Sequence, residues 1–316
     1  MVKSMLLYKV AVGKEGEMDN ADGLGSKKVL IITALTLVAS ILPDIIFREG
    51  IGSVPSVLSF VKLGIILLAY MVSLSFESKD IAKYCLVLGV ILFVDILSKL
   101  VVSSYFWQEA FPKQSFVGNF GGSILLKVAG IIPVILILLV LFKSPKEVYI
   151  VKGDLSIKAD EIKWLRIKKD KISWGRLAIV SALCISFGTA LLTVFTVTGT
   201  VPNLNTAHLI KYFPFVLLLA ILNSFCEGIV YRSAILGSLK NVLPKNQVIF
   251  TAAMFFGIAH YYGAPSGIIG VLMSCLLGWY MCRSMYETKG FFSSWIIHFM
   301  QDVVIFSTIL LLGNYY

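Results

Sequence analysis

Charged residues are scarce in this chain. Asp, Glu, Lys and Arg make up only 15% of the 316 residues, whereas hydrophobic residues make up 58% and the mean hydropathy is +0.87. So few charged side chains cannot cover the surface of a water-soluble domain of this size. The composition therefore excludes an ordinary soluble protein and indicates one whose main solvent is a lipid bilayer.

Several other features are sparse or absent. There is no CxxC pair, and the five cysteines lie in or at the ends of apolar runs, which argues against disulfide or metal roles. No segment shows the alternating pattern of strands, so a β-barrel is not expected. The net charge of +10 forms no basic face with interleaved aromatic residues, so nucleic acid is not an expected partner.

The chain has many long apolar runs. A hydrocarbon core of about 30 Å requires roughly 20 mostly apolar residues per helix. We therefore predict an all-α, polytopic transmembrane bundle of about eight or nine helices. The apolar segments lie near residues 29–47, 56–76, 82–105, 121–142, 176–198, 208–238, 246–262, 267–283 and 291–312.

Basic residues predict the orientation of the chain in a cell membrane. The stretch from Lys143 to Arg176 contains ten basic and five acidic residues, which is typical of a cytoplasmic loop. Lys27 and Lys28 place the N-terminus on the same side, and the four apolar segments between them and that loop agree. We divide the chain into a polar cytoplasmic tail (1–28), N-terminal transmembrane helices (29–142), a basic cytoplasmic loop (143–175) and a C-terminal transmembrane core (176–316).

Few ionisable residues interrupt the first half. Asp95 and Lys99 stand four residues apart and are expected to neutralise each other on one helix face. Asp44 and Lys62 lie near segment ends, where they could extend toward the headgroups. The loop at 143–175 contains a charged run around Trp164 that would suit an amphipathic helix on the membrane surface.

Three motifs in the second half contain ionisable residues within apolar segments. Such residues are costly in a bilayer, so each is a functional hypothesis by default. The first motif is the stretch Cys-Glu-Gly-Ile-Val-Tyr-Arg, which contains Glu227 and Arg232. A histidine that lies alone in an apolar segment is more often a structural residue. The other two motifs are Phe-Gly-Ile-Ala-His (Phe256 to His260) and His-Phe-Met-Gln-Asp (His298 to Asp302), whose end residues share a helix face.

These residue types suit peptide hydrolysis. A carboxylate can take a proton from water, and neutral imidazoles can bind a metal or donate hydrogen bonds to an oxyanion. Asp302 could orient His298 or help to bind a cation, and the residues leave both roles open. The spacing differs from the His-Glu-x-x-His pattern, in which one helix supplies two zinc ligands and the base.

The order of the three motifs resembles the CPBP family, which includes the CAAX proteases and bacteriocin-processing enzymes and is also called the Abi family. Its signature is Glu-Glu-x-x-x-Arg, Phe-x-x-x-His and His-x-x-x-Asn/Asp on successive membrane helices. The resemblance covers roughly residues 176–312. It implies that Glu227 activates water, that His260 helps to hold this water, and that His298 and Asp302 stabilise the oxyanion.

The resemblance also bears on the remaining site residues. It implies that Arg232 is structural or charge-balancing, and Phe256 belongs to the second motif. Zinc is compatible with the family, with His260, His298 and Glu227 as the candidate ligands, but no cofactor is certain. Gly228 replaces the second Glu of the signature, so Arg232 lacks its partner four residues back and is expected to pair with Asp302, or with Glu227 through a bent helix.

The leading hypothesis is an intramembrane endopeptidase. Its partners would be membrane lipids and a hydrophobic or lipid-modified peptide substrate, which the resemblance suggests is CAAX-like, pheromone-like or bacteriocin-like. The alternative is a non-catalytic scaffold or bacteriocin-immunity protein that uses the same polar cluster for packing. A transporter is less favoured, because the chain has no inverted repeat and no pair of broken helices.

Overall fold

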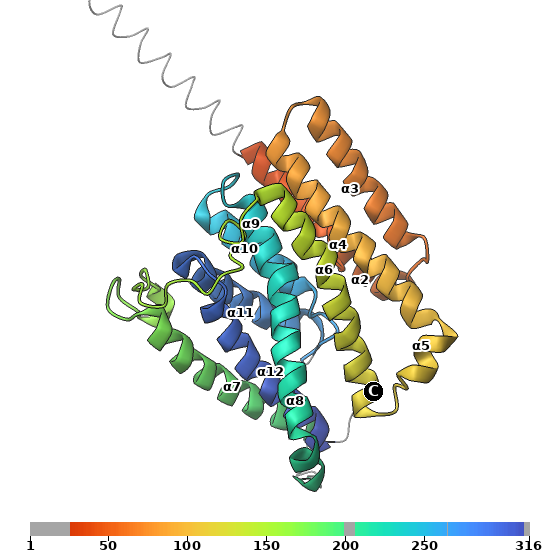
Figure 1. The fold of residues 1–316 in the computed structure, drawn as a ribbon, viewed down its shortest axis with the longest axis vertical. Helices are drawn as coiled ribbons and strands as arrows, with labels where there is room; N and C mark the ends of the chain where they lie inside the picture. The colour runs from red at the N-terminus through yellow and green to blue at the C-terminus, as the bar shows by residue number, and fades with distance from the viewer. Residues whose placement is uncertain (1–25, 199–205, 264, 313–316) are drawn as a thin grey trace, which may run out of the picture.

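The computed structural model describes residues 26–198, 206–263 and 265–312, and this part of the chain is almost entirely helical. Within it the only β pairing is two isolated bridges, Lys158 with Ser173 and Ile162 with Ile167. The predicted all-α class is therefore confirmed (Figure 1).

The first half forms a group of membrane-length helices joined by short connections. A helix over Ser26–Ala39 bends by 58° into the next one. The further elements are α2 (Leu42–Ile51), α3 (Leu58–Ser75), α4 (Lys79–Ser103), the short α5 (Tyr105–Ala110), a π-helical turn η1 (Val117–Gly121) and α6 (Gly122–Phe142).

The second half contains the rest of the bundle. It consists of the 3-10 turn η2 (Lys163–Leu165), α7 (Trp174–Thr198), α8 (Thr206–Glu227), the π-helical turn η3 (Gly228–Ser233), α9 (Ala234–Leu239), α10 (Lys245–Ile258), α11 (Gly267–Thr288) and α12 (Phe292–Leu312).

Seven of the nine predicted segments are helices long and apolar enough to cross a membrane, or eight if the bent pair forms one span. The prediction was wrong for residues 246–262, because α10 has only 14 residues, about 21 Å at 1.5 Å per residue. Most of its side chains are buried in protein. It is a core helix, a kind of apolar run that hydropathy alone cannot separate from a span.

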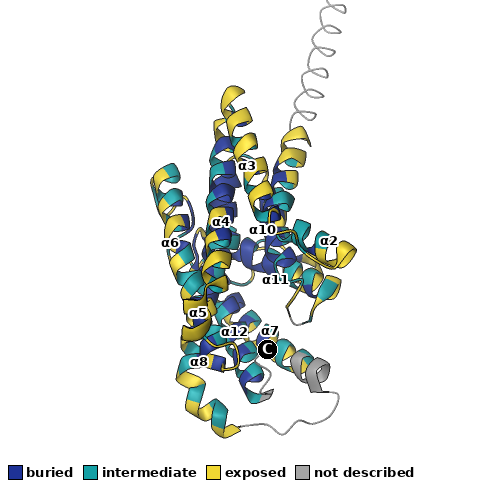
Figure 2. Cartoon of the chain, turned by 90° about the vertical axis from the view of Figure 1, so that its right-hand side faces the viewer, coloured by how far each residue is buried: buried dark blue, intermediate teal, exposed yellow. Residues whose placement is uncertain are grey.

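The helices pack in a defined sequence of neighbours. α3 contacts α4, α4 contacts α6, α6 contacts α8, and α8 contacts α12, which also packs on α7. α10 and α11 form another closely packed pair, and α11 contacts α12 (Figure 1). The outward faces of α3, α6 and α7 carry many exposed large hydrophobic side chains, as expected for lipid contact (Figure 2). The protein is thus an integral, multi-pass membrane protein.

Two lysines in the first half, Lys62 and Lys99, are paired with carboxylates. Lys62 Nζ lies 2.6 Å from Asp44 Oδ2, and the Lys62 side chain is only 3% exposed, so its charge is neutralised within the bundle. The predicted pair of Lys99 with Asp95 is confirmed at 2.7 Å, and Lys99 also lies 3.7 Å from Asp44. Asp44 is therefore a shared partner for two lysines.

The loop at 143–175 packs onto the helices and contains no amphipathic helix, so that expectation was wrong. Its Val148, Tyr149 and Ile162 side chains are buried. Glu287 at the end of α11 anchors the loop: its carboxylate accepts hydrogen bonds from the Asp160 amide and from Trp174 Nε1. Several residues of the loop are thus used in tertiary contacts, whereas Trp164 and Leu165 in the charged run remain exposed.

Candidate active site

The first site motif lies within a single long helical segment that runs from Thr206 to Leu239. Glu227 ends α8, and the next residues, Gly228–Ser233, form the π-helical turn η3 before α9 continues. A π-helical turn has i→i+5 hydrogen bonds, so residues five apart lie on nearly the same face. Glu227 and Arg232 therefore project to the same side, which an ideal α-helix would not allow.

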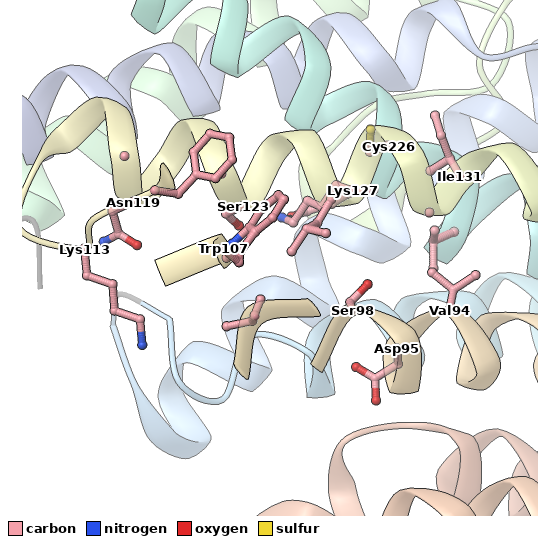
Figure 3. A pocket seen from close by; sticks show the side chains of 18 of the residues that line it. Val94, Asp95, Ser98, Trp107, Lys113, Asn119, Ser123, Lys127, Ile131 and Cys226 are labelled. Atoms are coloured by element: carbon pink, nitrogen blue, oxygen red, sulfur yellow. The ribbon is translucent and has the colours of Figure 1, made fainter. Parts of the chain in front are cut away.

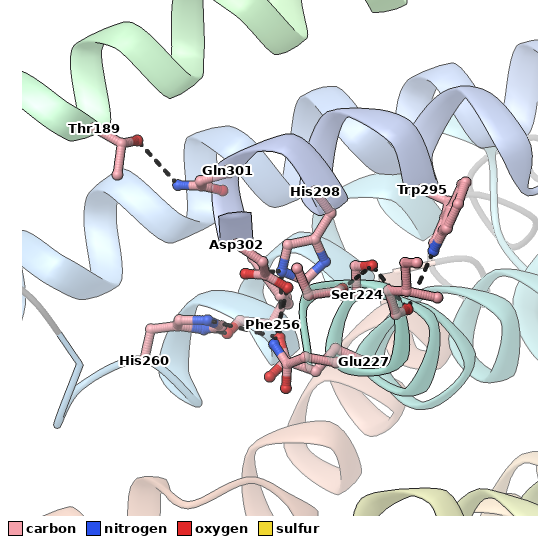
Figure 4. A network of polar contacts seen from close by, with 12 residues as sticks. Thr189, Ser224, Glu227, Phe256, His260, Trp295, His298, Gln301 and Asp302 are labelled. Atoms are coloured by element: carbon pink, nitrogen blue, oxygen red, sulfur yellow. Dashed lines mark hydrogen bonds and ion pairs between the residues drawn. The ribbon is translucent and has the colours of Figure 1, made fainter. Parts of the chain in front are cut away.

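Two helices bring histidines to Glu227. Glu227 Oε2 lies 3.5 Å from His298 Nε2 on α12 and 3.9 Å from His260 Nε2, just beyond α10 (Figure 4). This oxygen is buried and has no hydrogen-bond partner among the described residues. The structure thus brings together the three residues that the sequence singled out, with one carboxylate oxygen facing both imidazoles.

The neighbours of His260 fix its tautomer. Its Nδ1 lies 2.8 Å from the carbonyl oxygen of Phe256, one helical turn earlier. A carbonyl can only accept, so Nδ1 carries the proton and Nε2 has a free lone pair. That lone pair is directed toward Glu227, where it can accept a hydrogen bond. Phe256 contributes its carbonyl and also packs its ring on His260, with the centroids 4.3 Å apart.

His298 has the opposite tautomer. Arg232 Nη2 lies 3.2 Å from His298 Nδ1 and also donates to the Ser224 carbonyl at 3.3 Å. A guanidinium has no acceptor, so His298 Nδ1 accepts and Nε2 must carry the proton. His298 therefore presents an N–H toward Glu227 and Asp302. The two imidazoles offer one acceptor and one donor to the same space.

Asp302 lies on the same side of the His298 ring as Glu227, next to Nε2. Its Oδ1 is 3.5 Å from His298 Nε2, and its Oδ2 accepts a hydrogen bond from Asn223 Nδ2 at 3.0 Å. Sequence reasoning missed Asn223. The signal was present, because Asn223 stands four residues before Glu227 and so shares its helix face.

Arg232 has a different environment from the one expected. It is completely buried, and its Nε and Nη1 atoms have no hydrogen-bond partner among the described residues. It forms no ion pair with Asp302 or Glu227 in this structure, so the expected carboxylate partner is not found. Its contacts are His298, the Ser224 carbonyl and the ring of Phe256, whose centroid is 5.7 Å away.

Phe291 fills the space beside Gly228. A Cβ atom at Gly228 would lie 2.7 Å from Phe291 Cε2, closer still to Phe291 Cζ, and 2.9 Å from Arg232 Nη2. The Phe291 ring packs edge-on against Phe225, with centroids 5.3 Å apart. A Glu at this position, as in the family signature, would require Phe291 to move.

A lysine from the first half completes the site. Lys127 on α6 donates to Glu227 Oε1 at 2.7 Å and to Asn223 Oδ1 at 2.6 Å. The sequence analysis gave this lysine no role. An ammonium within a span costs about 2.5–3.5 kcal/mol on insertion scales, and this cost was the available signal.

Lys127 and Glu227 also line a cavity of about 770 Å³. Its walls come mainly from α4, the α5 region, α6 and η3, with Asp95, Trp107 and Tyr231 among the polar or aromatic lining residues (Figure 3). The described lining residues include neither His260 nor His298. Glu227 therefore stands between the cavity and the two histidines.

The donor chemistry does not fit a zinc site of His260, His298 and Glu227. A ligating imidazole needs a lone pair, and His298 Nε2 carries a proton while its Nδ1 faces Arg232. Glu227 Oε1 is also already bound to a cation, Lys127. Among the described residues, no cluster of three or more His, Cys, Asp or Glu side chains is placed to hold a metal ion.

Fold and site together define a polytopic membrane protein with a buried Glu–His–His–Asp cluster at the end of a cavity. Residues 209–304 match the family model of type II CAAX prenyl endopeptidases, Rce1-like. This match confirms the resemblance to the CPBP/CAAX protease family over the segment that contains all three motifs. No curated protein and no solved structure matches the chain.

Proposed function

We propose that the protein is an intramembrane endopeptidase that cleaves a hydrophobic or lipid-modified peptide. The observation that carries this proposal is Glu227 Oε2, a buried carboxylate oxygen without a hydrogen-bond partner among the described residues, which faces the acceptor of His260 and the donor of His298. The match to a protease family over residues 209–304 supports it independently.

The residues suit a reaction with water as the nucleophile. Glu227 Oε2 and His260 Nε2 are both acceptors, so a water between them would donate both of its protons and direct its own lone pair at a substrate carbonyl. Glu227 takes one proton as the C–O bond forms. The His298 Nε2–H group, which lies beside Asp302 Oδ1, stabilises the oxyanion. The proton held by Glu227 then passes to the leaving amine as the C–N bond breaks.

The cavity suggests the substrate class. Its walls are mostly apolar, and it reaches Glu227 from the side of α4 and α6. An apolar or lipid-modified peptide could enter from the bilayer and place its scissile carbonyl next to Glu227. CAAX-like, pheromone-like and bacteriocin-like peptides all have this character.

The test is cleavage of fluorogenic lipidated peptides by the protein in proteoliposomes. Glu227→Gln and His298→Ala should each abolish turnover, because they remove the base and the oxyanion donor. Asp44→Asn is a matched control, because Asp44 is another partly buried carboxylate held by a lysine, yet it lies outside the site. A Glu227→Gln protein that cleaves at the wild-type rate would exclude the proposal.

The same variant separates the two leading hypotheses. A scaffold or immunity protein acts by binding, so Glu227→Gln would alter its stability and leave its biological effect unchanged. A peptidase would lose its effect while still inserting into the membrane. Expression of the two forms in a cell that depends on the protein, with membrane levels compared, decides between them.

A further inference from the structure

The residue that holds the candidate general base comes from outside the segment that matches the protease family. Lys127 lies on α6, in the first half of the chain, ten residues after Val117 and so about 15 Å into the span Val117–Phe142. A lysine near a helix end can extend its ammonium group to the headgroups. Lys127 instead directs its ammonium group to α8.

Lys127 contacts two acceptors that share one face of α8. Its Nζ donates to Glu227 Oε1 at 2.7 Å and to Asn223 Oδ1 at 2.6 Å. Asn223 is itself oriented by its donation to Asp302 Oδ2 at 3.0 Å. One ammonium group thus links both carboxylates of the site, directly for Glu227 and through the Asn223 amide for Asp302.

This arrangement gives the two carboxylate oxygens of Glu227 different surroundings. Oε1 is held by a charge-assisted hydrogen bond from Lys127 on the cavity side. Oε2 is left without a hydrogen bond among the described residues and faces His298 and His260. Without Lys127, the carboxylate could rotate about its last torsion angles, and neither oxygen would be fixed toward the histidines.

We infer that Lys127 is a positioning residue for the proposed peptidase reaction, which places Glu227 Oε2 for proton abstraction and supplies its counter-charge. The inference rests on the proposed function. It also gives the first half of the chain a part in the chemistry, because the residues that match the protease family do not include the cation that holds their own base.

The test measures kcat and KM separately in the proteoliposome assay. Lys127→Met should lower kcat by about 10- to 100-fold, because displacement of a reacting group by about 1 Å can cost that much, and should leave KM within about twofold. Lys127→Arg keeps the charge and the donors and should restore kcat to within about tenfold of wild type.

A matched control separates this role from the general effect of losing a paired lysine in a membrane helix. Lys62→Met removes another lysine of a membrane helix that is paired with a carboxylate, Asp44, and its kcat should equal that of the wild-type protein. If Lys127→Met is not monodisperse after purification, Lys127→Gln provides the same test, because the amide can still donate but carries no charge. Its kcat should lie below that of the wild-type protein, because the counter-charge is lost, and above that of Lys127→Met, because a donor to Glu227 Oε1 remains.

The outcomes distinguish the two claims. No cleavage by the wild-type protein overturns the role of Lys127 and the proposed function together. Cleavage that Glu227→Gln abolishes, but that retains the wild-type kcat in Lys127→Met or Lys127→Gln, overturns only the role of Lys127. A rise in KM with an unchanged kcat also contradicts a positioning role.

Discussion

The packing of Phe291 against Gly228 predicts that Gly228→Ala changes the free energy of unfolding in opposite directions with and without the Phe291 ring. In a helix, Gly→Ala usually stabilises by about 0.8–1 kcal/mol because alanine has the higher helix propensity. At Gly228 the new Cβ would lie 2.7 Å from Phe291 Cε2 and 2.9 Å from Arg232 Nη2, and overpacking of this kind costs about 1–3 kcal/mol. Gly228→Ala should therefore destabilise the protein by up to about 2 kcal/mol.

Removing the ring should reverse that sign. Phe291→Ala alone should cost about 3–5 kcal/mol, because Phe291 is only 8% exposed. Once the ring is gone, Gly228→Ala should stabilise by up to about 1 kcal/mol, because the end of the Arg232 side chain, whose Nη2 would lie 2.9 Å from the new Cβ, can shift into the vacated space. The four proteins form a double-mutant cycle with a coupling energy of about 1–3 kcal/mol.

The assay is reversible unfolding in bicelles, followed by tryptophan fluorescence during denaturant titration. Gly188 on α7 provides a control, because a Cβ there meets nothing within 4 Å, so Gly188→Ala should have the same effect in both backgrounds. If Gly228→Ala has the same sign with and without the Phe291 ring, then Phe291 does not occupy the space beside Gly228, and the account of the missing Glu is refuted.

Three further predictions follow from the site and the loop. Arg232→Met should leave the free energy of unfolding unchanged or higher, because it replaces a buried cation whose hydrogen bonds are incomplete. It should also lower kcat at least tenfold, because the tautomer of His298 is no longer fixed. Equal losses of stability and activity would contradict this prediction. The hydrogen bond from Lys245 lowers the pKa of Asp160 in the folded protein. The stability that Asp160 gives to the docked loop is therefore fully present above the pKa of the unfolded state, about 3.9, and is lost as the pH falls through the lower pKa of the folded state. Limited proteolysis of the loop should therefore increase only in acid, and Asp160→Asn should remove this dependence. Excess zinc or a chelator should leave peptide cleavage unchanged, whereas a chelator-sensitive rate that zinc restores would contradict the assigned tautomer of His298.

Much of the fold followed from apolar length, since the bilayer sets one physical scale for every span. The exception is α10, where an apolar run of similar appearance is buried in protein. The loop at 143–175 was also misjudged, because its Asp160 binds a residue far away in the sequence, Lys245, which also pairs with Glu287 on α11. Hydropathy describes the preferred solvent of a segment and contains no information on such partners.

The site was partly accessible from the sequence. The cost of burying ionisable groups singled out Glu227, His260 and His298, and the structure brings them together. The expected carboxylate partner of Arg232 was wrong, because its guanidinium group contacts His298 and the Ser224 carbonyl instead. Lys127 was not assigned because its partner is 100 residues away on another helix, and only tertiary structure reveals that pairing.

The segment from Thr206 to Leu239 has 34 residues, which corresponds to about 51 Å at 1.5 Å per residue. A hydrocarbon core of about 30 Å cannot contain such a length even at a tilt of about 40°, which still leaves about 39 Å along the membrane normal. About 9 Å of this segment must therefore stand in the headgroups or the water. Glu227 is fixed within the segment, so its depth below the headgroups depends on bilayer thickness. For the proposed peptidase, lipid chain length would then determine which bond of an anchored peptide lies at the depth of the Glu227 carboxylate.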